Sequence, residues 1–185
     1  MVSTHPPTHC GIGAYGEQSV TQLRAQGHLV DIVTPDGQGN VDFAWELRGG
    51  SRLLRLFELL PYYSWIVDRF HLSTRAFQLE ATGHAPDFGW LEDRLRPLGF
   101  HVVLCTRRPD TFAAARRDRL VVSGNPAQYD DLSMFVAEQE LLRKLAQASS
   151  LPVLELDVSD DDVAGSCDRV ADWLASTGGL WAPAT

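Results

Sequence analysis

Short apolar runs alternate along the chain with longer stretches in which apolar residues recur at helical spacing. The apolar runs have the length of buried strands and cover Leu29–Thr34, Trp65–Val67, His101–Thr106 and Leu151–Asp157. The helical spacing predicts helices over Ala14–Gln26, part of Val41–Tyr63, Leu72–Thr82, Phe88–Leu98, Leu132–Ala148 and Val163–Ser176. Near-continuous apolar strands are typical of parallel sheets that helices cover on both faces. We therefore expect an α/β fold, with a three-layer parallel sheet of about five strands and helices on both faces.

Length and composition favour one globular domain over residues 1–185. Of the 185 residues, 44% are hydrophobic, which is ordinary for a packed core. The net charge of -8 argues against binding to nucleic acid or to an anionic membrane, since neither attracts an acidic chain. No apolar run reaches about 18 residues, and no basic region followed by an apolar one opens the chain, so we expect neither a membrane span nor a signal peptide.

The residue types that usually hold metals do not form a metal-binding pattern. Cys10, Cys105 and Cys167 are odd in number and lack Cys-x-x-Cys spacing, which favours neither a disulfide framework nor a zinc site. We expect free thiols in a cytoplasmic protein. The acidic run Ser159–Asp162 precedes the last predicted helix, where carboxylates suit the helix dipole, so we interpret it as a cap.

An acid and a base, Asp68 and Arg69, directly follow the apolar run Trp65–Val67. Ligands of open α/β sheets bind outside the carboxyl ends of the strands, so this charged pair is well placed to meet a ligand. Ser73 or Thr74 can cap the helix that follows. The alternative is that the two charges form a strand-end ion pair, which contributes little where it is solvated.

The spacing Asp-Arg-Phe-x-x-Ser-x-x-x-Phe-Gln that begins at Asp68 resembles the thymidylate-kinase-like branch of P-loop nucleotide kinases. The resemblance implies a P-loop kinase-like or Rossmann-like fold. It implies that Asp68 holds a substrate hydroxyl or a magnesium-bound water, and that Arg69 orients the acceptor phosphate. Ser73, Phe77 and Gln78 would bind the substrate, with Phe77 and Gln78 facing the base. The alternative for Phe77 is a place in the core.

Five arginines fall in the thirteen residues from Arg107 to Arg119, in an otherwise acidic chain. In the kinases that the previous stretch resembles, a lid follows the strand, and its arginines clamp the transferring phosphoryl group with planar bidentate donors. By that resemblance Arg107, Arg116 and Arg119 are predicted to bind phosphate. The alternative is a solvated charged helix.

The first part of the chain resembles a different family. Pro6-Pro7, the segment Cys10–Tyr15 and the segment Gly27–Thr34 resemble the first unit of GT-B glycosyltransferases of the family-4 type. By that resemblance Gly11 and Gly13 lie against substrate phosphate at a helix N-terminus, where glycine lets backbone N–H groups approach an anion. A tight turn without a ligand is the alternative.

The chain therefore reads as a composite, with residues 1–63 like a glycosyltransferase beginning and residues 64–181 like the body of a nucleotide kinase. No Gly-x-x-x-x-Gly-Lys-Ser/Thr loop occurs, and Lys144 is the only lysine. Our first hypothesis is a nucleotide-kinase-like phosphotransferase, impaired because it lacks the loop lysine, that uses Mg²⁺ with a nucleotide. The alternatives are a non-catalytic module for a nucleotide or sugar phosphate, or a glycosyltransferase-derived fragment. A homodimer is possible under each hypothesis.

The parallel arrangement also makes a geometric prediction. Gly13, Asp68 and Arg107 each follow a predicted strand, so they should lie on the same edge of the sheet. A site shared by the two resemblances depends on this arrangement.

Overall fold

The computed structural model describes residues 21, 24–25, 30–33, 52–68, 70–122 and 131–179. The described strands are β1 (Val30–Val33), β2 (Ser64–Val67), β3 (Val102–Thr106) and β4 (Val153–Asp157). The described α-helices are α3 (Arg52–Leu59), α4 (His71–Thr82), α5 (Gly89–Leu95), α6 (Phe112–Val122), α7 (Leu132–Gln147) and α8 (Val163–Thr177). Two 3₁₀ turns are also described. The turn η1 (Arg96–Leu98) directly follows α5, and the turn η2 (Pro109–Thr111) directly precedes α6.

The described residues do not form the expected sheet of about five strands, so the prediction of a three-layer parallel sheet is wrong. In the described parts of the chain, β1 pairs with β2 and β3 pairs with β4, each pair parallel, as two separate two-stranded sheets. Most of the remaining described residues are helical. The strand positions were predicted correctly, but the joining of the strands into one sheet was not.

Aromatic side chains, rather than backbone hydrogen bonds, join the two sheets. The Phe57 ring of α3 lies 5.6 Å from the Trp65 ring of β2 and 4.7 Å from the ring of Phe100, which precedes β3. Phe57 is only 1% exposed. Trp65 and Phe100 thus pack against the same ring, while no backbone pairing joins β2 to β3 in the described residues.

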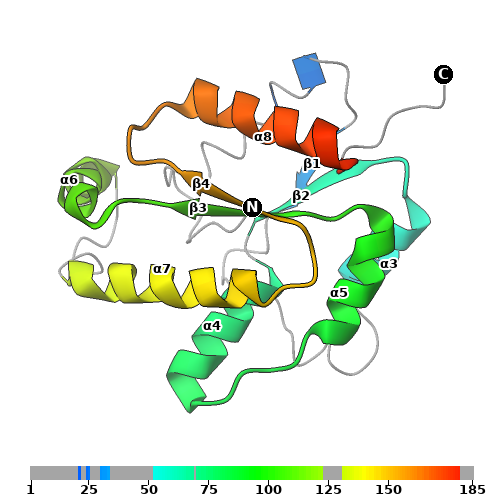
Figure 1. Cartoon of the computed structure of the whole chain (residues 1–185), viewed down its shortest axis with the longest axis horizontal. Helices are drawn as coiled ribbons and strands as arrows, with labels where there is room; N and C mark the ends of the chain where they lie inside the picture. Colours follow the sequence, from blue (N-terminus) through cyan, green and yellow to red (C-terminus); the bar gives the residue numbers. More distant parts are fainter. Residues whose placement is uncertain are drawn as a thin grey trace.

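Helices α7 and α8 lie on opposite sides of the β3–β4 pair (Figure 1). The larger core fills the space among α3, α4, α5, α7 and the strands β2 and β3, with Leu54, Phe57, Phe88, Leu91 and Leu95 almost fully buried. A second cluster under α8 contains Val103, Leu156, Val158 and Val170. Leu54 and Phe57 precede the Tyr63–Ser64 join of the two resemblances and pack in the same core as residues after it.

The ends of the helices follow local chemistry. The Asp162 side chain caps α8 by accepting a hydrogen bond from the backbone N–H of Gly165 at 2.9 Å, which confirms the predicted acidic cap. Helix α4 ends at Gly83, whose left-handed φ of 73° suits glycine. At its start the prediction is wrong: α4 begins at His71 after Phe70 and has no side-chain cap, so neither Ser73 nor Thr74 caps it.

Several predictions fall on parts of the chain that are not described. The predicted helix Ala14–Gln26 is described only at residues 21, 24 and 25, which are helical. Gly11, Gly13 and Arg69 lie outside the described residues, as does the side chain of Arg119. Among the helices that are described, none is long and apolar enough to cross a membrane.

Candidate functional site

The predicted site residues that are described lie on β2, α4 and the segment after β3. Asp68 directly follows β2, and Ser73, Phe77 and Gln78 lie on α4. Phe77 is 57% exposed, so it is not part of the core. Gln78 is half-buried. Because the Phe77 ring is exposed, it is free to make the predicted contact with a base.

Burial raises the pKa of the Cys105 thiol in β3 to about 11, and the carboxylate of Asp68 adds to the rise. A thiol with that pKa stays protonated at neutral pH, so Cys105 is not a nucleophile. The prediction that Gly13, Asp68 and Arg107 share one edge stays a prediction, because Gly13 lies outside the described residues.

Buried polar atoms without partners occur at the end of β2 and on α4, and we call Asp68, Ser73 and Arg75 the β2 polar group. Within the described structure, Asp68 Oδ1, Ser73 Oγ and Arg75 Nε are buried atoms that make no hydrogen bond. Each such atom costs about 1–3 kcal/mol of folding free energy, because it has given up water without gaining a partner. Buried polar atoms without partners are rare in folded proteins, and a role in binding is one reason for a protein to keep them.

Arg75 was not among the predicted site residues. It lies on the face of α4 that also carries the buried residues His71, Leu72 and Ala76. The sequence contains the signal for this placement, because Leu72, Arg75 and Ala76 are spaced three and four residues apart, as on one helix face. A charged residue on the apolar face of a predicted helix is therefore the sequence signal by which Arg75 could have been found.

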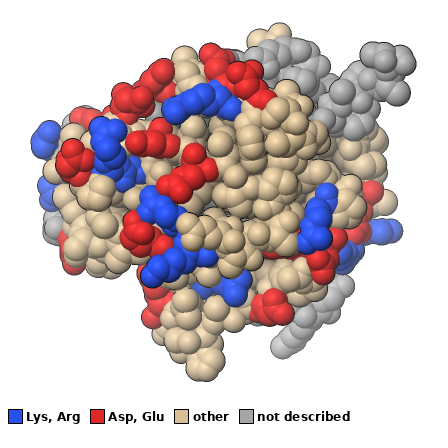
Figure 2. Space-filling model, viewed as in Figure 1, with Lys and Arg blue, Asp and Glu red and all other residues tan. Residues whose placement is uncertain are grey.

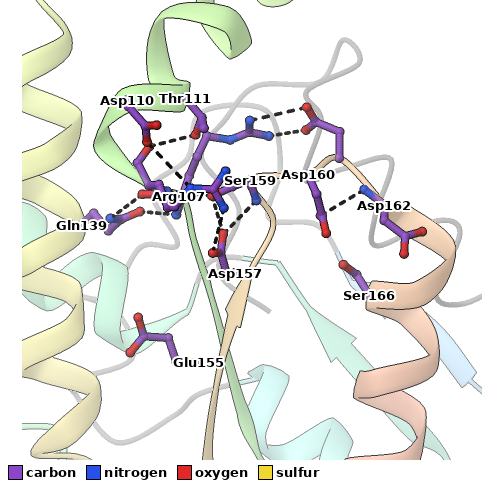
Figure 3. A network of polar contacts seen from close by, with 12 residues as sticks. Arg107, Asp110, Thr111, Gln139, Glu155, Asp157, Ser159, Asp160, Asp162 and Ser166 are labelled. Carbon is purple, nitrogen blue, oxygen red and sulfur yellow. Dashed lines mark hydrogen bonds and ion pairs between the residues drawn. The ribbon is translucent and has the colours of Figure 1, made fainter.

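The segments after β3 and β4 carry a second set of polar side chains, the β3–β4 polar network (Figure 3). It consists of Arg107, Arg108, Gln139, Asp157, Ser159 and Asp161. The Gln139 side chain of α7 accepts from the Arg107 backbone N–H at 2.7 Å and donates to its C=O at 3.0 Å. The Ser159 hydroxyl accepts from the Arg108 N–H at 2.8 Å.

Ion pairs complete this network. The Arg107 guanidinium pairs with Asp161, and Arg108 reaches Asp157 at 3.5 Å. Hydrogen bonds from the hydroxyl and backbone N–H of Ser159 lower the pKa of Asp157, and the nearby Arg108 and Arg107 lower it further. Every described member of the network has partners, so the network fastens α7 and the β4–α8 turn to the end of β3.

The predicted phosphate-binding arginines are only partly available. Arg107 is 14% exposed and pairs with the 61%-exposed Asp161, so a phosphate has to displace that carboxylate. Arg116 and Arg119 lie three residues apart on α6, and Arg116 has an interaction within the protein. Figure 2 shows basic and acidic side chains intermixed over the face that it presents.

A buried acid–histidine pair is the site feature that sequence reasoning missed. The His71 Nε2 of α4 and the Glu92 Oε1 of α5 lie 2.8 Å apart, and the two side chains are 3% and 9% exposed. Ser149 and Ser150 donate three further hydrogen bonds to Glu92 at 2.7–2.8 Å. Burial alone raises the pKa of Glu92, but the hydrogen bonds from His71, Ser150 and Ser149 outweigh it and lower the pKa to about 2.

The ionised Glu92 fixes which nitrogen of His71 carries hydrogen. A carboxylate only accepts hydrogen bonds, so His71 donates through Nε2–H. In the uncharged ring the lone pair is therefore on Nδ1. That atom is buried and has no partner in the described structure.

A cavity of about 430 Å³ lies between β2 and the start of β3. We call it the β2 cavity. It is lined by aromatic and aliphatic side chains and by the glycines that follow α5–η1 and α8, and its walls include Trp65, His71, Phe100, His101 and Val102. Its volume is within the range of pockets that hold small molecules.

The described residues offer little to a tightly held metal. No group of three or more His, Cys, Asp or Glu side chains is placed to hold an ion in the parts of the chain that are described. Mg²⁺ makes lesser demands, since one or two carboxylates together with phosphate oxygens and waters are enough for it. Asp68 Oδ1 is a carboxylate oxygen that can serve in that way.

Comparisons of the chain with protein-family models, with curated proteins and with solved structures found no match. The resemblances to nucleotide kinases and to glycosyltransferases therefore rest on the sequence motifs.

Proposed function

We propose that this chain binds a small molecule that carries both hydroxyl and phosphate groups, a nucleotide or a sugar phosphate, beside the end of β2. The observation that carries the proposal is the β2 polar group, whose three buried atoms have no partners among the described residues. Two of these residues, Asp68 and Ser73, are also positions of the kinase-like motif. The sequence motif and the burial thus both single out Asp68 and Ser73.

The chemistry of the group suits such a ligand. A carboxylate oxygen of Asp68 accepts a hydrogen bond from a ligand hydroxyl, while Ser73 Oγ or Arg75 Nε donates to a phosphate oxygen. Phe77 adds an exposed ring against which a base can stack. Asp68 repels a bare anion, so the site should prefer a ligand with a hydroxyl as well as a phosphate over inorganic phosphate.

Phosphoryl transfer is the second candidate function, and the kinase-like motif with the free carboxylate oxygen of Asp68 favours it. We expect it to be slow, because Lys144 is an exposed residue near the end of α7 and cannot replace a P-loop lysine. A coupled ADP-release assay over nucleoside monophosphates should give less than about one turnover per second. Faster turnover that Asp68→Asn abolishes would establish the kinase instead of the binding module.

Isothermal titration calorimetry with thymidine monophosphate, thymidine, glucose 6-phosphate and inorganic phosphate tests the binding proposal. A ligand with both group types should bind more tightly than inorganic phosphate. Asp68→Asn should weaken that binding by about tenfold, as expected for loss of a charge-assisted hydrogen bond. Asp93→Asn is the matched control, since Asp93 is 71% exposed on α5.

Two results would contradict the proposal. One is the absence of binding by all four ligands at millimolar concentration. The other is binding that Asp68→Asn, Ser73→Ala and Asp93→Asn leave equally strong.

A further inference from the structure

The β2 cavity is a slot through the layer of strands and not a hollow on one face of it. Its lining includes Leu95 and Phe100, which pack in the larger core, and Val170 and Leu174, which pack in the cluster under α8. Helix α7 contributes to the larger core and lies on the opposite side of the β3–β4 pair from α8 (Figure 1). The cavity therefore reaches from one face of the strand layer to the other, between β2 and β3.

Consecutive residues of both strands line this cavity. On β2 they are all four residues Ser64–Val67, and at the start of β3 they are His101, Val102 and Val103. Successive side chains of a strand point to opposite faces, so a cavity on one face would meet only every second residue. The unbroken runs therefore mean that the cavity lies along the edges of the two strands, where backbone N–H and C=O groups point.

The edge of β3 presents a backbone donor to the cavity. Val102 donates its N–H to the C=O of Pro152 at 2.8 Å, on the side of β4. The backbone groups of successive strand residues alternate in direction, so the N–H of Val103 points away from β4. Among the described strands, β3 pairs only with β4 and β2 pairs only with β1. A strand edge of this kind is a template for a further extended segment.

The folded chain leaves room along the edge of β2. Trp65 and Ile66 are apolar strand residues, yet they are only half-buried, and the cavity beside them measures about 430 Å³. None of the lining residues in the described part of the chain is Asp, Glu, Lys or Arg. Burying a charge there would cost its hydration without supplying a counter-charge. A segment that enters the cavity must therefore have uncharged side chains.

We propose that the β2 cavity is a docking site, independent of the phosphate-bearing ligand, for an extended segment of another polypeptide, about four residues long, that pairs with these strand edges. Four strand residues span about 13 Å, which matches the four residues of β2. A cavity of about 150 Å³ already holds benzene, so 430 Å³ gives room for small apolar side chains such as those of Ala and Val, but not for a row of aromatic ones. Backbone hydrogen bonds supply the affinity, and the apolar walls select the side chains.

The test uses the peptide acetyl-Ala-Val-Ala-Val-Lys-Lys-amide, in which the Ala-Val repeat is the docking segment and the lysines keep the peptide in solution. The control peptide has the same residues, but each backbone nitrogen of the Ala-Val repeat is methylated, so the repeat cannot donate to a strand edge. Calorimetric titration of the full chain should give an affinity for the first peptide about tenfold or more above that for the control. Equal affinities, or no binding of the first peptide at millimolar concentration, would overturn the proposal.

Amide hydrogen exchange measured by NMR locates the docked peptide. At saturation the N–H of Val103 should exchange about tenfold or more slowly than in the free chain, because a peptide C=O becomes its acceptor. In β2 the newly protected amides should be either Ile66 alone or Trp65 and Val67 together, since alternate residues face one edge. The N–H of Leu104 points toward β4 and is the internal control. A Val103 amide that is equally protected with and without peptide would contradict the proposal.

A larger side chain in the cavity wall should hinder docking. Leu98 is half-buried and lines the cavity, so Leu98→Trp should weaken binding of the unmethylated peptide by several-fold. Leu59→Trp is the matched control, because Leu59 is 59% exposed on α3 and is not a lining residue, and it should leave the affinity unchanged. If Leu98→Trp does not fold, the exchange measurement on the wild type decides the matter. An affinity that Leu98→Trp leaves unchanged would overturn the assignment of the cavity.

Discussion

Two sets of polar side chains lie near the strands, and they differ in whether their hydrogen bonds are made. In the β3–β4 polar network, Arg107, Asp157 and Ser159 each have partners within the protein. Beside β2, the atoms Asp68 Oδ1 and Ser73 Oγ are buried and have none in the described structure. The difference indicates that the first set holds the fold together, while the second set is kept at a cost in stability.

This comparison changes which residues are expected to meet a ligand. By resemblance alone, the arginines after β3 are the phosphate-binding residues. The structure shows Arg107 engaged with Asp161, whereas Asp68, Ser73 and Arg75 have unused capacity. Binding should therefore depend more on the β2 polar group than on the β3–β4 polar network.

The largest expected effect concerns Glu92, a buried carboxylate whose hydrogen bonds are all made inside the protein. Glu92→Ala leaves His71 and the Ser150 N–H without their acceptor and should lower the free energy of unfolding by about 3–5 kcal/mol. Glu80→Ala, at an exposed position on α4, should change it by no more than about 0.5 kcal/mol. Urea denaturation measures both variants. A loss below about 1 kcal/mol for Glu92→Ala would show that the pair is not structural.

The same residue predicts a dependence of stability on pH. The pKa of Glu92 is lowered from its usual 4.5 to about 2, so its stabilisation is complete above pH 4.5 and is lost as the pH falls toward 2. The loss should be on the order of 3 kcal/mol, from about 1.4 kcal/mol for each pKa unit. Urea denaturation over this pH range should show it in the wild type, with a shallower slope in Glu92→Gln. Parallel slopes would assign the acid sensitivity to other groups.

The smallest effect is expected at the exposed pair of Arg107 and Asp161. Asp161→Asn should lower the free energy of unfolding by about 1 kcal/mol, because Asp161 is 61% exposed and water screens its charge, although Arg107 is only 14% exposed. If Arg107 binds phosphate, as its position after β3 predicts, freeing it from Asp161 should also tighten binding of a nucleotide or sugar phosphate several-fold. An unchanged affinity in calorimetry would assign Arg107 to the fold alone.

The apolar runs predicted the strands well because a buried strand needs little more than a short run of apolar residues. They did not predict the pairing of the strands. The two sheets meet through the rings of Phe57, Trp65 and Phe100, and Phe57 and Phe100 come together only in the folded chain. No local pattern contains that information.

For the candidate site too, the sequence predicted the local features and missed the long-range contacts. Asp68 and Ser73 were found because they belong to one short motif, and the acidic cap at Asp162 was found because capping is local. The Glu92 site was missed since its partners lie 21 residues away at His71 and 58 residues away at Ser150. Long-range polar contacts of this kind have no signature in a single sequence.

The most direct test of the central claim compares two serines, one from each polar set. Ser159→Ala removes a hydroxyl that bonds Asp157 and the Arg108 N–H, so it should lower the free energy of unfolding by about 1–3 kcal/mol. Ser73→Ala removes a buried hydroxyl oxygen that has no partner in the described structure, so it should leave the stability unchanged or raise it by up to about 1 kcal/mol. Urea denaturation of the ligand-free variants decides the matter. A loss in Ser73→Ala as large as that in Ser159→Ala would contradict the claim that the polar atoms beside β2 are held for a ligand.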